Sequence, residues 1–194
     1  SIEIDPFLVK SLNNKKSLKK LKVLNCDILK TDIVDLKIDN PVRVIGNIPY
    51  NITSQIIFWL IEQLDYWEDA FIMVQKEVAQ RLTADVNTKQ YGRLTVVVQA
   101  YLDVKYCFSV SPNVFIPKPK VESAFIHFTK KSIPLIKDEK YIKFNNLVRT
   151  AFGQRRKMLR NSLKSWDIPE KVKEKIDFSR RPETLTIKEF CLMV

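Results

Sequence analysis

The first two thirds of the chain alternate between short apolar runs and segments in which apolar residues recur at helical spacing. Runs of strand length occupy residues 1–4, 21–24, 42–45, 70–74, 104–110 and 123–128. In the last run, either Ala124, Ile126 and Phe128 or the opposite set faces inward. Helices are predicted at residues 54–64, 76–83 and 94–101, and a further one at residues 5–12, because Asp5 can cap a helix and Pro6 suits its first position. Strands separated by helices predict an α/β domain with a largely parallel sheet.

The pattern changes after residue 130, where no further strand is evident. Short amphipathic helices are predicted at residues 141–152, 154–165, 169–175 and 186–193. Thr186 and Glu189 are placed as a capping box for the last of these helices. A proline-rich link at residues 111–120 joins the last two strands and is not expected to be regular structure. We therefore divide the chain into an α/β domain, residues 1–133, and a small all-helical domain, residues 134–194.

The charge of the chain is strongly basic and unevenly distributed. The net charge is +11, and residues 137–181 hold 14 Lys and Arg against 6 Asp and Glu. A basic surface of this kind is suited to a polyanion, because binding releases counterions from phosphates. The sequence therefore favours a nucleic-acid partner over a basic but otherwise ordinary surface.

The cysteines and the hydropathy pattern indicate which cellular setting fits the chain. The cysteines Cys26, Cys107 and Cys191 are odd in number and far apart, so we expect neither a metal site nor a disulfide framework. No apolar run has membrane-spanning length, and residues 1–10 lack the pattern of a signal peptide. We expect a cytoplasmic monomer without a membrane segment.

The segment with the most chemical information is Gly46-Asn47-Ile48-Pro49-Tyr50, directly after a predicted strand. Ligands of open α/β sheets bind beyond the carboxyl ends of the strands. The side-chain oxygen of Asn47 can accept a hydrogen bond from an exocyclic amine, and a backbone carbonyl near Ile48 or Pro49 can accept a second. Tyr50 can stack on a base. The alternative is a plain strand-to-helix turn.

This tetrapeptide resembles the (Asn/Asp)-Pro-Pro-(Tyr/Phe) motifs of amino-methyltransferases, and residues 47–54 resemble the KsgA-type ribosomal RNA adenine dimethyltransferases. Further stretches resemble the same family in the same order, at residues 3–5, 26–29, 75–82, 91–94, 114–123, 151–159 and 180–183. The resemblance implies a Rossmann-like, S-adenosylmethionine-dependent methyltransferase sheet followed by a small all-helical domain.

The resemblance also implies the reaction. The expected activity is methyl transfer from S-adenosyl-L-methionine to the exocyclic amines of two adjacent adenines. The expected substrate is a hairpin loop near the 3′ end of small-subunit (16S-type) ribosomal RNA, with a role in ribosome biogenesis. The target base must leave its stack, and Tyr50 and Phe115 are expected to enclose it. The catalytic residues implied are Asn47, Ile48, Pro49, Tyr50 and Phe115. For Phe115 the alternative is a core position.

The residues expected to hold the methyl donor follow two strands near the start of the chain. By resemblance, Glu3 accepts the ribose hydroxyls and Asp27 accepts the adenine amine. The alternatives are a surface carboxylate for Glu3 and a helix N-cap for Asp27. The full set of expected donor-binding residues is Glu3, Ile4, Asp27, Ile28 and Asn47.

The expected RNA-binding residues are basic. Those of the helical domain recur at near-helical spacing and predict a basic helix face, the alternative being an ordinary solvated face. Those of the proline-rich link are expected to meet phosphates, the alternative being solvated loop charges. The two groups are Arg149, Arg155, Arg156, Lys157 and Arg160, and Lys118 and Lys120. The lone His127 falls within a predicted strand, where a structural role is favoured.

The sequence departs from the family pattern at its beginning. The family has a Gly-rich donor loop about twenty residues before its acidic strand end, whereas Glu3 already follows two residues after the start of the chain. The only glycines are Gly46, Gly92 and Gly153. We therefore expect the first strand and the donor loop to be absent, and this polypeptide neither to bind the donor normally nor to methylate. A smaller departure is Gln55, where the family has proline.

Two other functions are compatible with the motifs. The first is an adenine methyltransferase of the antibiotic-resistance type acting on large-subunit ribosomal RNA. The second is a non-catalytic RNA-binding assembly or transcription factor of the same family. The basic segment 155–157 and the extended helical tail favour the small-subunit enzyme.

Overall fold

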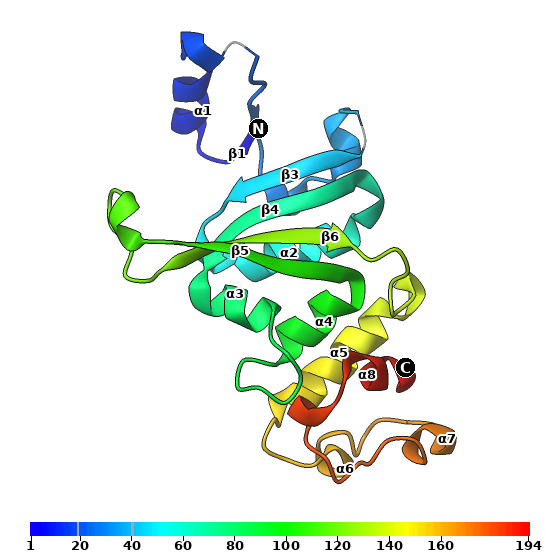
Figure 1. Cartoon of the computed structure of the whole chain (residues 1–194). Helices are drawn as coiled ribbons and strands as arrows, with labels where there is room; N and C mark the ends of the chain where they lie inside the picture. Colours follow the sequence, from blue (N-terminus) through cyan, green and yellow to red (C-terminus); the bar gives the residue numbers. More distant parts are fainter. Residues whose placement is uncertain (19, 40) are drawn as a thin grey trace.

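The computed structural model describes residues 1–18, 20–39 and 41–194 and has an α/β architecture (Figure 1). Four strands form one sheet in the order β3-β4-β6-β5, and two short strands form a separate pair. The bounds of the strands are β1 Ile2–Glu3, β2 Leu24–Asn25, β3 Val42–Asn47, β4 Trp67–Gln75, β5 Leu102–Val110 and β6 Ser123–Lys130.

The prediction of a largely parallel sheet is wrong for the four-stranded sheet. β3 and β4 are parallel, but β6 is antiparallel to both of its neighbours, β4 and β5. The reason is the connection between β5 and β6, which is the proline-rich link rather than a crossover helix. Consecutive strands that pair without a crossover run antiparallel. The β1–β2 pair is parallel, as predicted.

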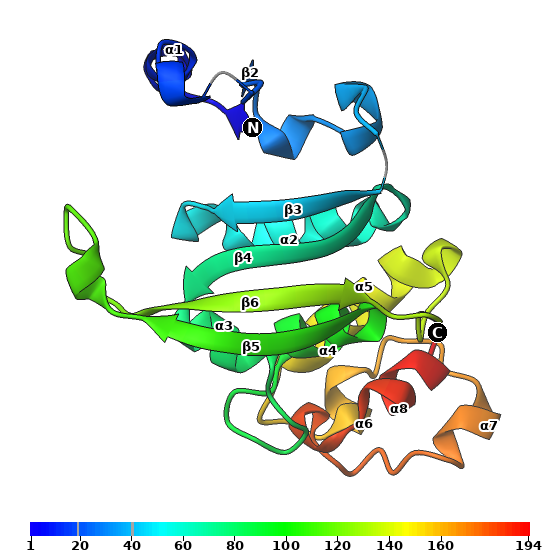
Figure 2. The same ribbon diagram turned by 45° about the horizontal axis from the view of Figure 1, so that its top comes forward.

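Three helices cover one face of the sheet (Figure 2). They are α2 (Thr53–Glu62), α3 (Lys76–Leu82) and α4 (Arg93–Tyr101). α2 forms where the sequence predicts it because its apolar side chains recur on one side, and Ile57 and Leu60 are fully buried there. On the facing side of β6, Ala124, Ile126 and Phe128 are each 0% exposed, so the first of the two expected sets faces the core.

The start of the chain confirms one prediction and corrects another. α1 (Pro6–Asn13) begins with Pro6, and the Asp5 carboxylate accepts hydrogen bonds from the backbone N–H groups of Phe7 and Leu8, at 2.8 and 3.4 Å. The strand predicted at residues 21–24 is wrong in its bounds, because β2 covers only Leu24–Asn25. Its partner β1 is two residues long, so only two residues of β2 can pair with it.

Helices make up the regular structure of the last part of the chain, together with short turns. The helices are α5 Tyr141–Gly153, α6 Leu159–Ser162, α7 Glu170–Lys173 and α8 Ile187–Leu192. The predicted capping box of α8 is present, since Thr186 Oγ1 accepts from the Glu189 N–H at 3.2 Å and the Glu189 carboxylate accepts from the Thr186 N–H at 2.7 Å. Short 3-10 turns occur at Lys16–Leu18, Ile28–Lys30, Ile33–Leu36, Tyr50–Ile52, Leu64–Tyr66, Pro112–Val114, Asp138–Lys140 and Pro182–Thr184.

The helix predicted at residues 154–165 is wrong. α5 ends at Gly153, residues 154–158 form a turn, and α6 has only four residues. The backbone N–H groups of Leu159 and Arg160 donate to the carbonyls of Arg180 and Phe178, at 2.9 and 3.0 Å. These bonds to a distant segment replace the bonds that a continuous helix would make. The apolar core nevertheless runs without a break from α4 into α5 and α8.

The buried carboxylate of Asp69 links three strands through side-chain hydrogen bonds on the face of the sheet away from α2. Asp69 accepts two hydrogen bonds from Arg43, at 2.7 and 3.0 Å, and lies 3.0 Å from His127 Nε2. The His127 ring stacks on Phe71, with the ring centroids 4.1 Å apart. The hydrogen bonds from Arg43, followed by that with His127, hold the pKa of Asp69 below its ordinary value. His127 therefore has the structural role that its position in a strand favours.

We expect Asp69→Asn to flatten the acid side of the stability profile. A lowered pKa in the folded state stabilises the protein above the unfolded-state pKa of about 3.9, and this contribution is lost as the pH falls through that value and below it. Urea unfolding between pH 7 and pH 3 should show a steeper loss of the free energy of unfolding in the parent protein than in the variant. Parallel profiles for the two proteins would show that Asp69 has an ordinary pKa in the folded state.

Candidate functional site

A hollow of about 180 Å³ lies at the carboxyl end of β3. The proline-rich link between β5 and β6 projects beyond the same end of the sheet (Figure 1). It brings Phe115 to the tetrapeptide that follows Gly46, although the two are distant in sequence. The residues that line the hollow are Asn47, Ile48, Pro49, Tyr50, Met73, Phe115, Pro117 and Pro119.

The amide of Asn47 is available to a ligand. Asn47 is the last residue of β3, its side chain is exposed, and it makes no side-chain hydrogen bond within the described part of the chain. The turn after it is tight, because a Cβ atom at Gly46 would lie 3.1 Å from both Ile48 Cγ2 and Ile72 Cδ1. Glycine at this position lets β3 pass close to its neighbours and present Asn47 at the edge of the hollow.

The backbone carbonyls of Ile48 and Pro49 differ in whether they are free to accept a hydrogen bond from a ligand. The Pro49 carbonyl already accepts a hydrogen bond from the Ile52 N–H at 3.2 Å, which closes the 3-10 turn Tyr50–Ile52. The Ile48 carbonyl has no such partner among residues 1–18, 20–39 and 41–194. Of the two carbonyls considered from the sequence, that of Ile48 is therefore the freer acceptor beside Asn47.

Tyr50 is held in place by a contact that the sequence does not indicate. Its hydroxyl lies 2.5 Å from Ser123 Oγ, and Ser123 is fully buried as the first residue of β6. This hydrogen bond fixes the orientation of the Tyr50 ring beside the hollow. Phe115 stands in the same hollow on the link and is half-buried, so it is not the core residue that was the alternative. The arrangement offers two aromatic side chains, a free amide and a free carbonyl around one base-sized space.

Sequence reasoning missed three further residues of the hollow. Pro117 and Pro119 carry a signal in retrospect, because prolines stiffen the link that positions Phe115. Met73 lies beside the hollow because of the strand register, in which it pairs with Asn47 between the parallel strands β3 and β4. No local pattern marks Met73 as different from any other strand residue.

Four of the expected donor-binding residues are on or just after the short strands β1 and β2, beyond the β3 edge of the larger sheet (Figure 2), whereas Asn47 is the last residue of β3. One carboxylate oxygen of Glu3 accepts from the Asp5 N–H at 2.9 Å, and the other is free of protein hydrogen bonds. Asp27 Oδ1 accepts from the Leu29 N–H at 3.0 Å, so Asp27 is indeed a cap. Its Oδ2 lies 4.0 Å from the exposed ammonium group of Lys30, and neither Oδ2 nor the Ile28 N–H has a hydrogen bond within the described residues.

These groups fit an adenosine-containing donor. The free oxygen of Glu3 suits a ribose hydroxyl, while Asp27 Oδ2 and the adjacent Ile28 N–H offer an acceptor and a donor to the edge of an adenine. The cap at Asp27 does not compete with that role, because it uses only one oxygen. Ile4 follows Glu3 and is exposed at 63%.

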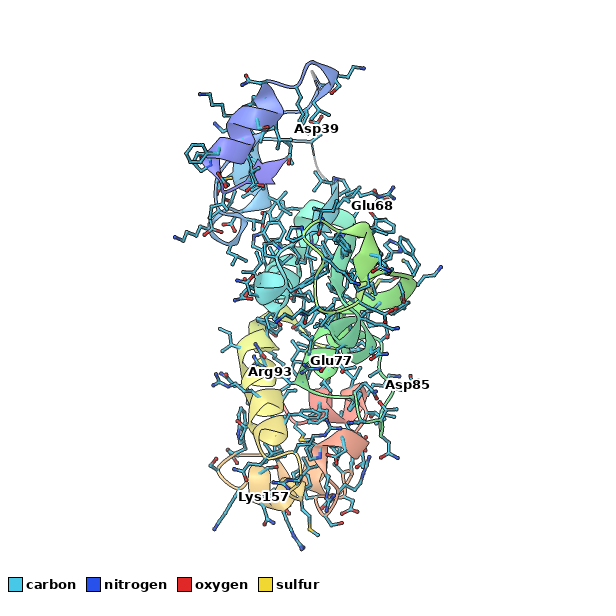
Figure 3. All side chains as sticks on the ribbon, turned by 90° about the vertical axis from the view of Figure 1, so that its left-hand side faces the viewer. Asp39, Glu68, Glu77, Asp85, Arg93 and Lys157 are labelled. Atoms are coloured by element: carbon cyan, nitrogen blue, oxygen red, sulfur yellow. The ribbon has the colours of Figure 1, made fainter. Side chains whose placement is uncertain are left out.

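The expected RNA-binding residues do not form the basic helix face that their spacing predicts. Arg149 is exposed on α5, but Arg155, Arg156 and Lys157 lie in the turn that follows it. Figure 3 shows Lys157 at the end of the molecule opposite Asp39. Arg160 follows on α6 and is exposed. We call residues 155–160 the basic turn.

Arg155 differs from the other basic residues of this turn. It donates hydrogen bonds to the carbonyls of Lys89 and Thr88, at 3.0 and 3.1 Å, and lies 4.0 Å from Glu183. It therefore ties the loop before α4 to the helical region. Arg149, Arg156, Lys157 and Arg160 form no ion pair or side-chain hydrogen bond among the residues with described positions, and neither do Lys118 and Lys120 beside the hollow. Their charges are available to phosphates.

The described residues contain neither a membrane-spanning helix nor a cluster of metal-binding side chains. No helix there is long and apolar enough to cross a membrane. No group of three or more His, Cys, Asp or Glu side chains there is arranged to hold a metal ion.

Comparison with known proteins gives consistent matches over the whole chain. The family model of ribosomal RNA adenine dimethylase matches residues 1–194. The ribosomal RNA small subunit methyltransferase A of Flavobacterium johnsoniae is 43% identical over 195 residues, covering 99% of this chain and 73% of that protein. The protein of the same name from Clostridium botulinum (strain Kyoto / Type A2) is 40% identical, covering 98% of this chain and 72% of that protein.

Two solved structures have a similar fold. A dimethyladenosine transferase from Plasmodium falciparum superposes with a TM-score of 0.80 at 26% identity, covering 99% of this chain and 78% of that one. The 23S rRNA methyltransferase ErmE superposes with a TM-score of 0.70 at 27% identity, covering 100% of this chain and 79% of that one.

Proposed function

The chain belongs to the ribosomal RNA adenine dimethylase family, and from this premise we propose that the protein, as the cell makes it, dimethylates adenine amines of small-subunit ribosomal RNA. It is an S-adenosylmethionine-dependent methyltransferase. The observation that carries the proposal is the hollow at the end of β3, which Asn47, Ile48, Tyr50 and Phe115 line together and where the Asn47 amide and the Ile48 carbonyl have no hydrogen-bond partner among the described residues. We further propose two adjacent adenines of a 3′-terminal hairpin loop as the target.

Asn47 and Ile48 orient the exocyclic nitrogen of the target adenine, which is the nucleophile of the reaction. The exocyclic nitrogen of adenine is a poor nucleophile because its lone pair is delocalised into the ring. When its two hydrogens are donated to Asn47 Oδ1 and the Ile48 carbonyl, the nitrogen is held with its lone pair directed away from both acceptors. Orientation and preorganised dipoles of this kind account for much of the acceleration in many enzymes. After the transfer, the proton leaves the amine to solvent, so no dedicated general base is required.

The aromatic side chains and the shape of the hollow select the substrate. The volume of about 180 Å³ equals that of about six water molecules in the liquid, which suits one flipped base rather than a base pair. Stacking on Tyr50 and Phe115 contributes roughly 1–3 kcal/mol per base and offsets the cost of unstacking the target. Met73, Pro117 and Pro119 complete an apolar wall that tolerates the first methyl group when the second is added.

S-adenosyl-L-methionine, when bound, supplies the methyl group as an electrophilic sulfonium substituent. We propose that Glu3, Ile4, Asp27, Ile28 and Asn47 hold it, with Glu3 toward the ribose and Asp27 and Ile28 toward the adenine. The free carboxylate oxygens and the free Ile28 N–H support this assignment.

Ribosomal RNA outside the hollow is proposed to contact the exposed cations of the link and of the helical region, residues 134–194. These residues are Lys118, Lys120, Arg149, Arg156, Lys157 and Arg160. We propose that the protein acts as a monomer. We also propose a cytoplasmic location, which the similarity to bacterial ribosomal RNA methyltransferases supports.

We expect Tyr50→Phe to lower the methylation rate only moderately. The variant keeps the aromatic ring but loses the hydrogen bond to Ser123, whose net worth of about 0.5–1.5 kcal/mol corresponds to a factor of about two to twelve. Ser123→Ala should give a loss of the same size, and the double variant should lose no more than either single one. Single-turnover methylation rates measure this, and additive losses would show that the two side chains act independently.

The proposed function is tested by mapping dimethyladenosine in both ribosomal RNAs. A strain that lacks the gene should lose the modification from the small-subunit RNA only, and the protein as the cell makes it should restore it to purified small subunits. Loss of the modification from the large-subunit RNA would instead assign the antibiotic-resistance type. RNA binding without any methylation would assign a non-catalytic assembly factor.

A further inference from the structure

A second, larger cavity lies at the opposite end of the sheet from the hollow. Its volume is about 680 Å³, and it is formed where α2 ends, β6 ends and α5 begins. In Figure 1 these segments gather at the end of the sheet away from the proline-rich link. Small-molecule pockets have volumes of about 300–1,000 Å³, so the cavity has the size of a small organic ligand rather than of a single ion. None of the residues assigned above to methyl transfer or to donor binding lines this cavity.

The charges in the cavity are unlike those of the rest of the protein. Glu62, Asp65 and Asp138 line it, and none of the three forms a salt bridge or a side-chain hydrogen bond with another described residue. They come from three elements around the opening, and all three are exposed. On a chain of net charge +11, this is a local concentration of uncompensated negative charge.

The two lysines of the cavity do not neutralise these carboxylates. Lys130 donates to the Leu64 carbonyl at 2.9 Å and lies 6.0 Å from the centroid of the Trp67 ring. Lys131 is paired with the carboxylate of Asp103, which is outside the cavity. Both ammonium groups are therefore already engaged, and the cavity is unsuited to an anion such as an RNA phosphate.

A buried hydroxyl in the wall gives independent evidence of a missing partner. Tyr101 lines the cavity, is only 1% exposed, and its hydroxyl has no hydrogen-bond partner among the described residues. A buried polar group without a partner is costly and rare in folded proteins. Burial, followed by the charge of Asp138, raises the pKa of this hydroxyl, so it stays protonated and its oxygen can accept a hydrogen bond.

The remaining walls suit an alkyl chain with cationic ends. Ile61, Leu64 and Pro134 supply apolar surface between the carboxylates, and the rings of Tyr101 and Tyr141 meet edge to face with centroids 5.7 Å apart. Aromatic rings attract ammonium groups, and carboxylates on separate elements match charges that are spaced along a chain. No metal-binding group of side chains is present among the described residues, which argues against a divalent cation as the occupant.

We propose that this cavity is a binding site for an alkyl polyamine, a small organic cation with two or more ammonium groups. One ammonium group donates to Tyr101 and pairs with Asp138, and another pairs with Glu62 or Asp65. The site is independent of the hollow at the end of β3. The two are connected by α2, which begins beside the hollow and ends at the cavity, and by β6, which begins at Ser123 beside Tyr50 and ends at Lys130 in the cavity wall.

The test is calorimetric titration of the RNA-free protein with spermidine at physiological ionic strength. We expect saturable binding of one spermidine per chain, weaker binding of putrescine and much weaker binding of the monoamine butylamine. Tyr101→Phe should weaken spermidine binding by about tenfold or more, because hydrogen bonds to charged groups contribute about 1.5–3 kcal/mol. The thermal unfolding midpoint of this variant without spermidine should be equal to or above the parent value, since the lost hydroxyl is buried and has no hydrogen-bond partner among the described residues.

A matched pair of charge variants separates the cavity from general attraction. Asp138→Asn should weaken binding, whereas Glu139→Gln, which removes the same charge from the next residue but does not line the cavity, should leave it nearly unchanged. Equal losses in the two variants would overturn the proposal, because they would show bulk electrostatics only. It would be overturned equally by the absence of saturation, or by magnesium binding as tightly as spermidine.

Discussion

Replacing Asn47 by Ala is expected to lower the methylation rate by at least about a hundredfold, the size of effect seen when one preorganised catalytic hydrogen-bonding group is removed. The side chain is exposed at the hollow and has no hydrogen bond to another described residue. Its loss therefore removes one acceptor from the target amine and leaves the fold intact. The Ile48 carbonyl alone would hold one hydrogen, and the nitrogen lone pair would no longer be directed toward the methyl group.

The control for this prediction is Asn51→Ala. Asn51 is exposed in the same turn but does not line the hollow, so its amide is chemically matched and differently placed. Single-turnover rates with saturating RNA measure the chemical step, and RNA affinity measured separately should be the same in the parent and both variants. A loss of RNA affinity in Asn47→Ala with an unchanged single-turnover rate would assign Asn47 to binding rather than to catalysis.

The sequence predicts elements well where local pattern and tertiary packing agree. The helix α2 follows from the spacing of apolar residues such as Ile57 and Leu60, because the same spacing that marks a helix also supplies its buried face. The cap at Asp5 follows from chemistry within four residues. β2 is different, because its length is set by the two-residue partner β1 and not by its own apolar run.

The residues of the candidate site also differ in whether local sequence or tertiary structure determines their positions. The Asn47 amide and the turn after it are local, and they can be inferred from one short segment. Tyr50 and Ser123 meet only because β6 is inserted next to β4, and no local signal in either segment indicates that contact. The position of Phe115 beside Tyr50 was implied by family resemblance, not by any pattern in the proline-rich link.

The basic turn shows how a correct composition can accompany a wrong geometry. The spacing of Arg149, Arg156 and Arg160 fits a helix, but hydrogen bonds from Leu159 and Arg160 to a segment about twenty residues away keep the chain from continuing as one. Helical spacing is only a local criterion, and here distant backbone partners outweigh it. The cations remain exposed in the turn, so the expectation of an RNA contact survives the change of structure.

We expect replacement of Arg156, Lys157 and Arg160 by Gln to weaken RNA binding by about a hundredfold at physiological salt, since each phosphate contact contributes a slope of about 0.7–0.9 in log affinity against log salt. None of the three has a protein partner to lose, so stability should be unchanged. The slope itself should become shallower by about two to three, which a general loss of fold would not produce.

The matched control for the basic turn replaces Lys171, Lys173 and Lys175 by Gln, which removes the same charge from the same helical region. Among the described residues, only Lys173 of this set has a partner, Glu170 at 3.0 Å in an exposed pair of small energetic value. If RNA contacts the basic turn, the control variant should keep nearly the parent slope of log affinity against log salt. Equal slopes in the two triple variants would mean that RNA is attracted by total charge alone. Arg155→Gln tests the structural role of Arg155, which donates hydrogen bonds to the carbonyls of Thr88 and Lys89. We expect this variant to have a lower unfolding temperature and nearly the parent salt dependence of RNA binding.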